Sequence, residues 1–124
     1  MKLFDSSVLI AHLRDDQNAT ELLREAVNNQ QAACSVLSRV ELEGGMRSRE
    51  RSSVARLFSV LSLQPVTDII AAHAGELLRS YRRSHPGIDI ADYVIAATAD
   101  VLGAELLTLN VKHFPMFKGL TSAF

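Results

Sequence analysis

Four side chains with oxygen ligands stand at positions that suggest a shared metal site. They are Asp5, Glu41, Asp92 and Asn110. If the three carboxylates meet, each pair of like charges at ~4 Å costs on the order of 4 kcal/mol at an effective dielectric near ~20, so a cation must relieve the repulsion. Oxygen ligands without His or Cys favour a hard ion, and we therefore expect Mg²⁺ or Mn²⁺ together with waters and a substrate phosphate.

Each acidic residue also has a simpler structural explanation. Asp5 and Ser6 are both of the type that caps a helix, and position alone does not decide between capping and chemistry for Asp5. Asp89 and Asp92 suit the N-cap and N3 positions of the next helix, where the helix dipole favours acids. Capping explains Asp92 less well than Asp89, because an aspartate one turn into a buried helix needs a cation or hydrogen-bond donors around it.

Glu41 and Asn110 have structural alternatives as well. Glu41 shares a helix stripe with Leu37 and Gly44, whereas Glu43 points about 200° away and is expected to be a solvated surface charge. A surface position for Glu41 stays open, because Glu is rarely buried without a partner. Asn110 is a common turn residue, and taken alone that explanation is the stronger one.

Short apolar runs alternate with helical patterns and place these polar residues at the ends of elements. The predicted strands are 1–4, 31–36, 105–109 and an edge strand over 119–124. The predicted helices are 8–13, 18–29, 37–49, a segment that ends near 63, 67–84 and 90–102. Strands that alternate with helices of this length favour βαβ units. We therefore predict a single α/β domain over 1–124, a three-layer α/β/α sandwich with a central, mainly parallel sheet, whose functional crevice lies beyond the carboxyl ends of the strands.

Composition restricts the class of protein. Thirteen basic and fourteen acidic residues give a net charge of -1, so attraction to nucleic acid must come from local patches. Charges interrupt every apolar stretch before membrane-helix length, and Asp5 comes too early for a signal peptide, so we expect a soluble cytoplasmic protein. Cys34 is the one cysteine, which excludes an internal disulfide, and its apolar context predicts a buried strand position.

Four segments, taken in chain order, resemble the successive motifs of PIN-domain VapC toxins. They are Leu-Phe-Asp5-Ser-Ser-Val-Leu-Ile, Ser38-Arg-Val-Glu41-Leu-Glu-Gly44, Ile90-Ala-Asp92-Tyr-Val-Ile-Ala-Ala-Thr98-Ala and Leu107-Thr108-Leu-Asn110-Val-Lys-His113-Phe114. The resemblance covers essentially the whole chain and is specific, since several spaced motifs coincide. It implies a metal-dependent endoribonuclease that is the toxin of a type II VapBC toxin–antitoxin system.

The resemblance implies roles for the site residues. Asp5, Glu41 and Asp92 would form the acidic triad of a metal-activated hydrolysis of an RNA phosphodiester. Asp5 and Asp92 would hold the ion, while Glu41 would bind a second ion or orient the attacking water. Asn110 would take the fourth position, where many PIN domains have Asp, and this leaves the occupancy of a second metal site open.

Other residues would have supporting roles. Ser6 and Thr108 would support the carboxylates or contact phosphate, and Asp89 would be an accessory acid or a helix cap. The cations expected to contact RNA are Arg39, Arg47, Arg82, Arg83 and Lys112. A solvated helix face explains Arg82 and Arg83 equally well. The four histidines, His12, His73, His85 and His113, lack the clustering of metal ligands, so surface or packing roles are expected.

The resemblance also implies partners. A VapB-type antitoxin would block the groove and insert a basic side chain among the acids, and a homodimer is expected. Five apolar residues suit either the core or a partner-facing surface: Val54, Leu57, Phe58, Val60 and Leu61.

Two other functions compete with the nuclease. One is a catalytically silent PIN-like module that binds RNA or protein without cutting it. The other is a phosphate-binding receiver-like domain, but the chain lacks the acidic cluster directly after the first strand and a phosphate-binding Gly-rich loop. Metal-dependent cleavage would separate the nuclease from the silent module. The sequence does not specify which RNA would be cut.

Overall fold

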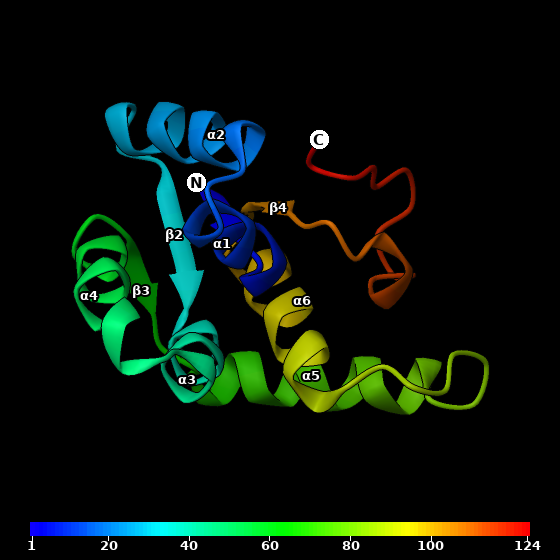
Figure 1. The fold of residues 1–124 in the computed structure, drawn as a ribbon. Helices are drawn as coiled ribbons and strands as arrows, with labels where there is room; N and C mark the ends of the chain where they lie inside the picture. Colours follow the sequence, from blue (N-terminus) through cyan, green and yellow to red (C-terminus); the bar gives the residue numbers. More distant parts are fainter.

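A four-stranded parallel sheet forms the centre of the molecule in the computed structural model, which describes all 124 residues (Figure 1). The strands are β1 (Lys2–Phe4), β2 (Ala32–Ser35), β3 (Ser62–Gln64) and β4 (Glu105–Leu107). Their order across the sheet is β3-β2-β1-β4. All three strand pairs are parallel, and β1 pairs on its two sides with β2 and β4.

Six α-helices connect the strands. They are α1 (Ser6–Leu13), α2 (Gln17–Asn28), α3 (Val36–Gly45), α4 (Arg51–Ser59), α5 (Asp68–Tyr81) and α6 (Ile90–Leu102), with short 3-10 helices η1 (Ser48–Glu50) and η2 (Val111–His113). Local sequence explains several ends: Thr67 accepts a hydrogen bond from the backbone of Ile70 at the start of α5, and Gly103 ends α6 with a positive φ of 62°. No helix has the combined length and apolar character that a bilayer-spanning segment needs.

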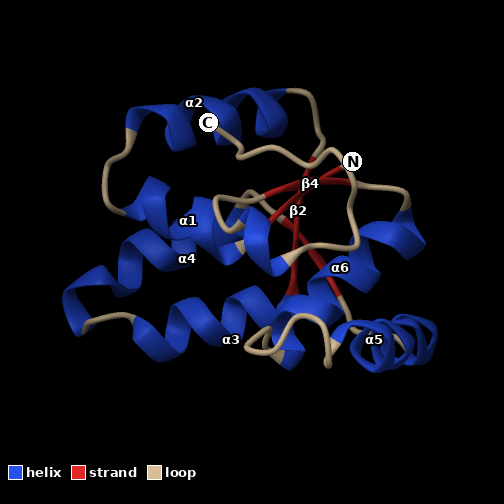
Figure 2. Cartoon of the chain, turned by 90° about the vertical axis from the view of Figure 1, so that its right-hand side faces the viewer, coloured by secondary structure: helices blue, strands red, loops and turns tan.

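Helices cover both faces of the sheet, which confirms the predicted three-layer α/β/α arrangement. Side chains of one strand alternate between the faces. Leu3 and Leu106 pack with residues of α6, whereas Phe4 and Leu107 belong to the core formed with α1, α2 and α4. Helix α5 packs on α6. Figure 2 shows the short strands enclosed between these two groups of helices.

Cys34 lies in β2 and is fully buried, as its apolar context predicts. Burial raises the pKa of its thiol to about 12, so the thiol stays protonated at neutral pH. Most of the apolar residues that suited either core or partner surface are also buried, namely Val54, Leu57, Phe58 and Leu61; Val60 alone of these is exposed.

The elements differ from the sequence-based expectation in three places. The helix expected to end near 63 ends at Ser59, and β3 follows it, because a three-residue edge strand carries almost no periodic pattern. The helix expected over 37–49 begins at Val36, ends at Gly45 and is followed by η1. Residues 119–124 form no strand, although the backbone N–H of Ala123 donates to the Thr108 carbonyl at 2.9 Å.

The chain order of the strands reverses beside β1. From β1 the chain builds outward through β2 to β3, and then returns to the other side of β1 as β4. Such a reversal leaves an opening at the carboxyl ends of the two strands that flank it, which is where ligands bind in open α/β sheets. Asp5 follows β1 and Thr108 follows β4 at this opening.

Candidate active site

Asp5 is the most firmly held residue of the site. Its side chain is 4% exposed, and its Oδ2 atom accepts hydrogen bonds from Ser7 Oγ at 2.8 Å and from Thr108 Oγ1 at 2.7 Å. The Ser7 hydroxyl accepts a bond from the Leu109 N–H, and the Thr108 hydroxyl accepts one from the Asn110 N–H. Because an ionised carboxylate can only accept, both hydroxyls donate their protons to Asp5, while the two N–H groups hold the hydroxyl oxygens in place.

The capping explanation of Asp5 is not supported by its contacts. Asp5 occupies the N-cap position of α1, but its side chain makes no capping hydrogen bond. Its Oδ1 atom accepts no protein side-chain bond, and no buried side-chain oxygen in the protein lacks a partner, so Oδ1 is open to solvent or a ligand. One oxygen of Asp5 is therefore fixed by the protein and the other is available.

Asp92 lies in the first turn of α6, and its side chain is 16% exposed. Burial raises the pKa of this carboxyl group above its ordinary value, the nearby His113 partly offsets the rise, and repulsion from Asp5 and Asp89 adds to it. His113 Nδ1 lies 3.1 Å from Asp92 Oδ2. Because Asp5 acts on the pKa of Asp92, the fold brings these two residues, which are distant in sequence, close enough for their charges to interact.

Asp89 stands at the N-cap position of α6, yet its side chain makes no capping bond and is exposed. Its backbone carbonyl accepts the Asp92 N–H at 3.0 Å. The carboxylate of Asp89 is therefore free to act on the acidic region from its edge.

Glu41 joins the site through serines. Ser6 Oγ donates to Glu41 Oε1 at 3.0 Å, and the same Oγ lies 3.0 Å from the buried hydroxyl of Ser38. Glu41 itself is exposed, so it lies at the mouth of the site next to the α1 N-terminus and not between the other carboxylates. Glu43 is a surface charge paired with Arg39, as expected.

Asn110 follows Thr108 on the loop after β4 and is exposed at the start of η2. Its side chain makes no capping hydrogen bond there. Its backbone N–H fixes the Thr108 hydroxyl, so Asn110 contributes to the site at least through its main chain.

The donor set fits an open metal site but not a closed one. No group of three or more His, Cys, Asp or Glu side chains lies close enough to form a complete protein-only metal site. Mg²⁺ is usually bound through one or two carboxylates, with waters and substrate phosphates completing the shell. Asp5, with a free oxygen, and Asp92, whose anion is destabilised mainly by burial and further by Asp5 and Asp89, supply two such carboxylates.

The predicted RNA-contacting cations fall into different environments. Arg39 is already engaged, because its Nε donates to Glu43 at 3.2 Å and its guanidinium lies 4.9 Å from the Phe58 ring centroid. Arg47 lines a groove that begins at Glu41. Arg82 and Arg83 line a separate surface hollow on α5, and Lys112 is exposed on η2.

Three residues that lie inside the motif segments had been given no role in the site, although they contact it. Ser7 donates to Asp5, Ser38 touches Ser6, and His113 touches Asp92. The position of Ser7 two residues after a strand-end aspartate was a usable signal. His113 had been assigned to a surface or packing role, and the structure instead places it against an acid of the site.

The sequence is similar to known proteins along almost its whole length. Residues 2–115 match the family model described as PIN domain. Ribonuclease VapC10 of Mycobacterium tuberculosis is 52% identical over 124 residues, which cover 100% of this chain and 93% of that protein. Ribonuclease VapC19 of the same organism is 48% identical over 121 residues, covering 97% of each.

A solved structure has the same fold. The crystal structure of DNA-bound VapBC from Salmonella typhimurium contains a chain that superposes with a TM-score of 0.83 at 20% identity, covering 98% of this chain and 96% of that one. At this identity the likeness concerns the fold alone.

Proposed function

The chain belongs to the PIN-domain family, and from this premise we propose that it is a Mg²⁺- or Mn²⁺-dependent endoribonuclease, the toxin of a VapBC toxin–antitoxin pair. Two relatives named as ribonucleases, each near half identical over almost the whole chain, support RNA cleavage. The observation that carries the proposal is Asp5: a buried carboxylate with one oxygen fixed by two hydroxyls and the other left free beside Asp92.

The proposed mechanism assigns a task to each acid. Asp5 and Asp92 would hold the cation, each with the carboxylate oxygen that the hydroxyls or His113 do not contact. When bound, the cation lowers the pKa of a water and neutralises charge on the phosphoryl oxygens. Glu41, kept in place by Ser6, orients the attacking water from the mouth of the site, and Asn110 presents a neutral oxygen to water or phosphate.

The supporting residues act through the carboxylates. Thr108 and Ser7 fix the orientation of Asp5, and outer-sphere hydrogen bonds of this type commonly change metal affinity or activity by about 10–100-fold. Asp89 adds negative charge at the edge of the site, which favours cation binding. RNA phosphates would approach between the acids and the exposed cations Arg47, Arg82, Arg83 and Lys112.

The deciding experiment is cleavage of a mixed pool of tRNA and ribosomal RNA by purified, partner-free protein in Mg²⁺ or Mn²⁺. We expect discrete products that disappear in EDTA and in an Asp5→Asn/Asp92→Asn double variant. Glu25→Gln, which removes an exposed acid on α2, is the matched control and should cut normally. Intact RNA with retained binding would replace this proposal by the catalytically silent module.

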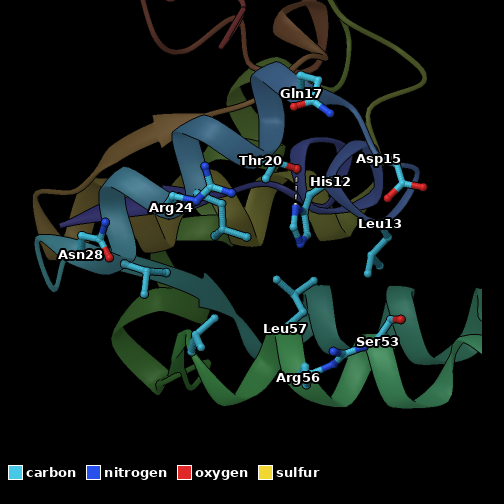
Figure 3. A pocket seen from close by; sticks show the side chains of 13 residues that line it. His12, Leu13, Asp15, Gln17, Thr20, Arg24, Asn28, Ser53, Arg56 and Leu57 are labelled. Carbon is cyan, nitrogen blue, oxygen red and sulfur yellow. Dashed lines mark hydrogen bonds between the residues drawn. The ribbon is translucent and has the colours of Figure 1, made fainter.

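We place the antitoxin in the groove of about 580 Å³ between α1, α2 and α4 (Figure 3). Apolar side chains line it, including Leu13, Leu57 and the exposed Val60. Its charged residues are Asp15, Arg56 and Arg24, of which Arg24 is paired with Glu21. Burial lowers the pKa of His12, which contacts Thr20 at 2.9 Å in this groove. An amphipathic antitoxin segment would fit such a surface.

We propose that a homodimer forms through α3 and α5, and not through the apolar residues of α4 that the sequence suggested. The apolar side chains of α4 are largely buried, so they cannot form it. Val40 on α3 and Ile69 on α5 are 67% and 70% exposed, and both helices contribute to one core cluster through Leu37 and Ile70. Light scattering of the wild type and of Ile69→Asp tests this surface, since a dimer that uses it should dissociate.

A further inference from the structure

A groove of about 480 Å³ lies between α1, α3 and η1, and Glu41 is one of its lining residues. Its walls combine a few apolar side chains with five charged ones. The lining residues include Ile10 and Arg14 of α1, Glu41 and Leu42 of α3, and Arg47, Arg49 and Glu50 around η1. The groove is thus continuous with one acid of the candidate active site.

The charge of this groove is dominated by guanidinium groups. Arg14, Arg47 and Arg49 are exposed, and none of the three forms an ion pair. Elsewhere Arg24 and Arg39 are each paired with a glutamate. Three free guanidinium groups facing one hollow repel one another, which is a cost that an anionic ligand removes.

The two glutamates of the groove offset only part of this charge, because three arginines against two glutamates leave a net positive charge. Glu50 Oε1 accepts a hydrogen bond from the backbone N–H of Arg47, so it is used in ordering the turn. Glu41 accepts the Ser6 hydroxyl at the end nearest the acids. The lining therefore keeps a net positive charge, and Arg14 lies at the end of α1 opposite to Ser6 and Glu41.

The length of the groove exceeds one phosphate group. Ser6, which contacts Glu41, and Arg14 lie at the two ends of α1, eight residues and about 12 Å apart at ~1.5 Å per residue. A polyanion that reaches the arginines from the acids must therefore extend over this distance. Arg is suited to phosphate because its planar group donates two parallel hydrogen bonds.

We propose that this groove binds the backbone of single-stranded RNA on one side of the cleavage position, with Arg14, Arg47 and Arg49 contacting successive phosphates. The inference rests on the proposed ribonuclease function and adds the path of the substrate. It assigns binding to Arg14 and Arg49, which lie outside the acidic motifs. The proposed RNA path does not include the surface hollow lined by Arg79, Arg82 and Arg83 of α5 and the residues after it.

The test measures binding of a fluorescently labelled, mixed-sequence RNA oligonucleotide by polarisation in EDTA, where cleavage is blocked, over a range of salt concentrations. Arg14→Gln/Arg49→Gln should weaken binding at least 10-fold at low salt. It should also make the slope of log K against log salt shallower by about 1–2, the loss of two phosphate contacts. Arg14→Lys/Arg49→Lys should keep most of the slope, because the charges remain.

The matched control is Arg51→Gln/Lys118→Gln, which removes two positive charges from exposed positions outside the groove. It should change affinity less than about twofold. Equal losses in the two Gln pairs, or an unchanged salt slope for Arg14→Gln/Arg49→Gln, would overturn the inference. So would intact RNA binding with loss of antitoxin binding in that variant, because the groove would then hold an acidic peptide.

The inference and the proposed function fail in different ways. If the wild type cuts RNA in Mg²⁺ while Arg14→Gln/Arg49→Gln binds RNA normally, the nuclease stands and the groove assignment is wrong. If the wild type shows neither binding nor cleavage of RNA, the ribonuclease proposal and the inference that rests on it are both overturned. Circular dichroism of every variant verifies that the fold is retained.

Discussion

Thr108 Oγ1 donates a hydrogen bond of 2.7 Å to Asp5 Oδ2 and so joins two residues that stand 103 positions apart in the chain. The contact exists because β1 and β4 are parallel neighbours, with Phe4 opposite Leu107, so that the residues after each strand meet at the same edge. The fold itself therefore sets the orientation of the acid on which the proposed chemistry depends.

Replacement of Thr108 by Val should impair the site without changing its charge. The variant keeps the shape of the side chain but leaves Asp5 Oδ2 with the Ser7 hydroxyl alone and removes the acceptor of the Asn110 N–H. We expect Mg²⁺-dependent cleavage to fall by about 10–100-fold and the free energy of unfolding to fall by about 1–3 kcal/mol. Cleavage rates and urea denaturation measure the two effects.

Thr108→Ser is the control for this prediction, since it retains the hydroxyl. It should recover most of the Mg²⁺ affinity even if the lost methyl group lowers stability. Equal activity of the Val and Ser variants would show that the hydroxyl does not orient Asp5.

His113 should act by positioning Asp92. Its Nδ1 atom lies 3.1 Å from Asp92 Oδ2, which leaves the other carboxylate oxygen for a ligand. His113→Ala should weaken Mn²⁺ binding, measured by calorimetry, by about 10-fold or more. His113→Asn places an amide nitrogen near the position of Nδ1 and should recover part of the loss. If His113→Ala binds Mn²⁺ like the wild type, the contact has no positioning role.

Asp92 should make the metal-free protein less stable at neutral pH. Its folded-state pKa is raised, mainly by burial, so the contribution of this group to stability is fully present below its unfolded pKa and is lost as pH rises through the folded value. Asp92→Asn in EDTA should therefore melt roughly 2–5 °C above the wild type at pH 7.5, with the difference shrinking toward pH 4. Differential scanning fluorimetry measures this shift.

Mg²⁺ should make the wild type more stable than Asp92→Asn, which is the reverse of the order expected in EDTA. A cation that binds only the folded state raises the melting temperature of the wild type. Asp92→Asn lacks one of the carboxylates proposed to bind the cation, so its melting temperature should rise little. A wild type that is as stable as Asp92→Asn in EDTA at every pH would contradict the proposed repulsion among Asp5, Asp89 and Asp92.

The sequence was sufficient to predict the parts of the site that depend on strand ends. Asp5 and Thr108 could be placed at one edge because parallel strands bring their carboxyl ends together. The alternation of helices and strands likewise predicted the three layers, and Gly103 the end of α6. These features depend on patterns that span many residues or on backbone conformations that few residue types adopt.

The remaining features depend on side-chain geometry that no spacing rule encodes. The selection of Ser7 as a donor to Asp5 requires the Leu109 N–H on a distant loop, and the contact of His113 with Asp92 requires the turn of η2. Strand β3 was missed because its hydrogen bonds to β2 come from tertiary packing and not from local preference.

Val60→Asp should separate the toxin from its antitoxin while leaving the nuclease intact. Val60 is 48% exposed at the end of α4 and lines the groove of Figure 3 together with Leu13 and Leu57. An antitoxin side chain packed there would bury the new carboxylate without a partner, and we expect affinity to fall by about 2–4 kcal/mol. The acids lie elsewhere, so cleavage by free protein should stay within about twofold, and the variant should cut RNA even when antitoxin is added.

Val101→Asp, at a similarly exposed valine on α6 outside this groove, is the matched control and should still be inhibited. Full inhibition of Val60→Asp by the antitoxin would show that the partner binds another surface.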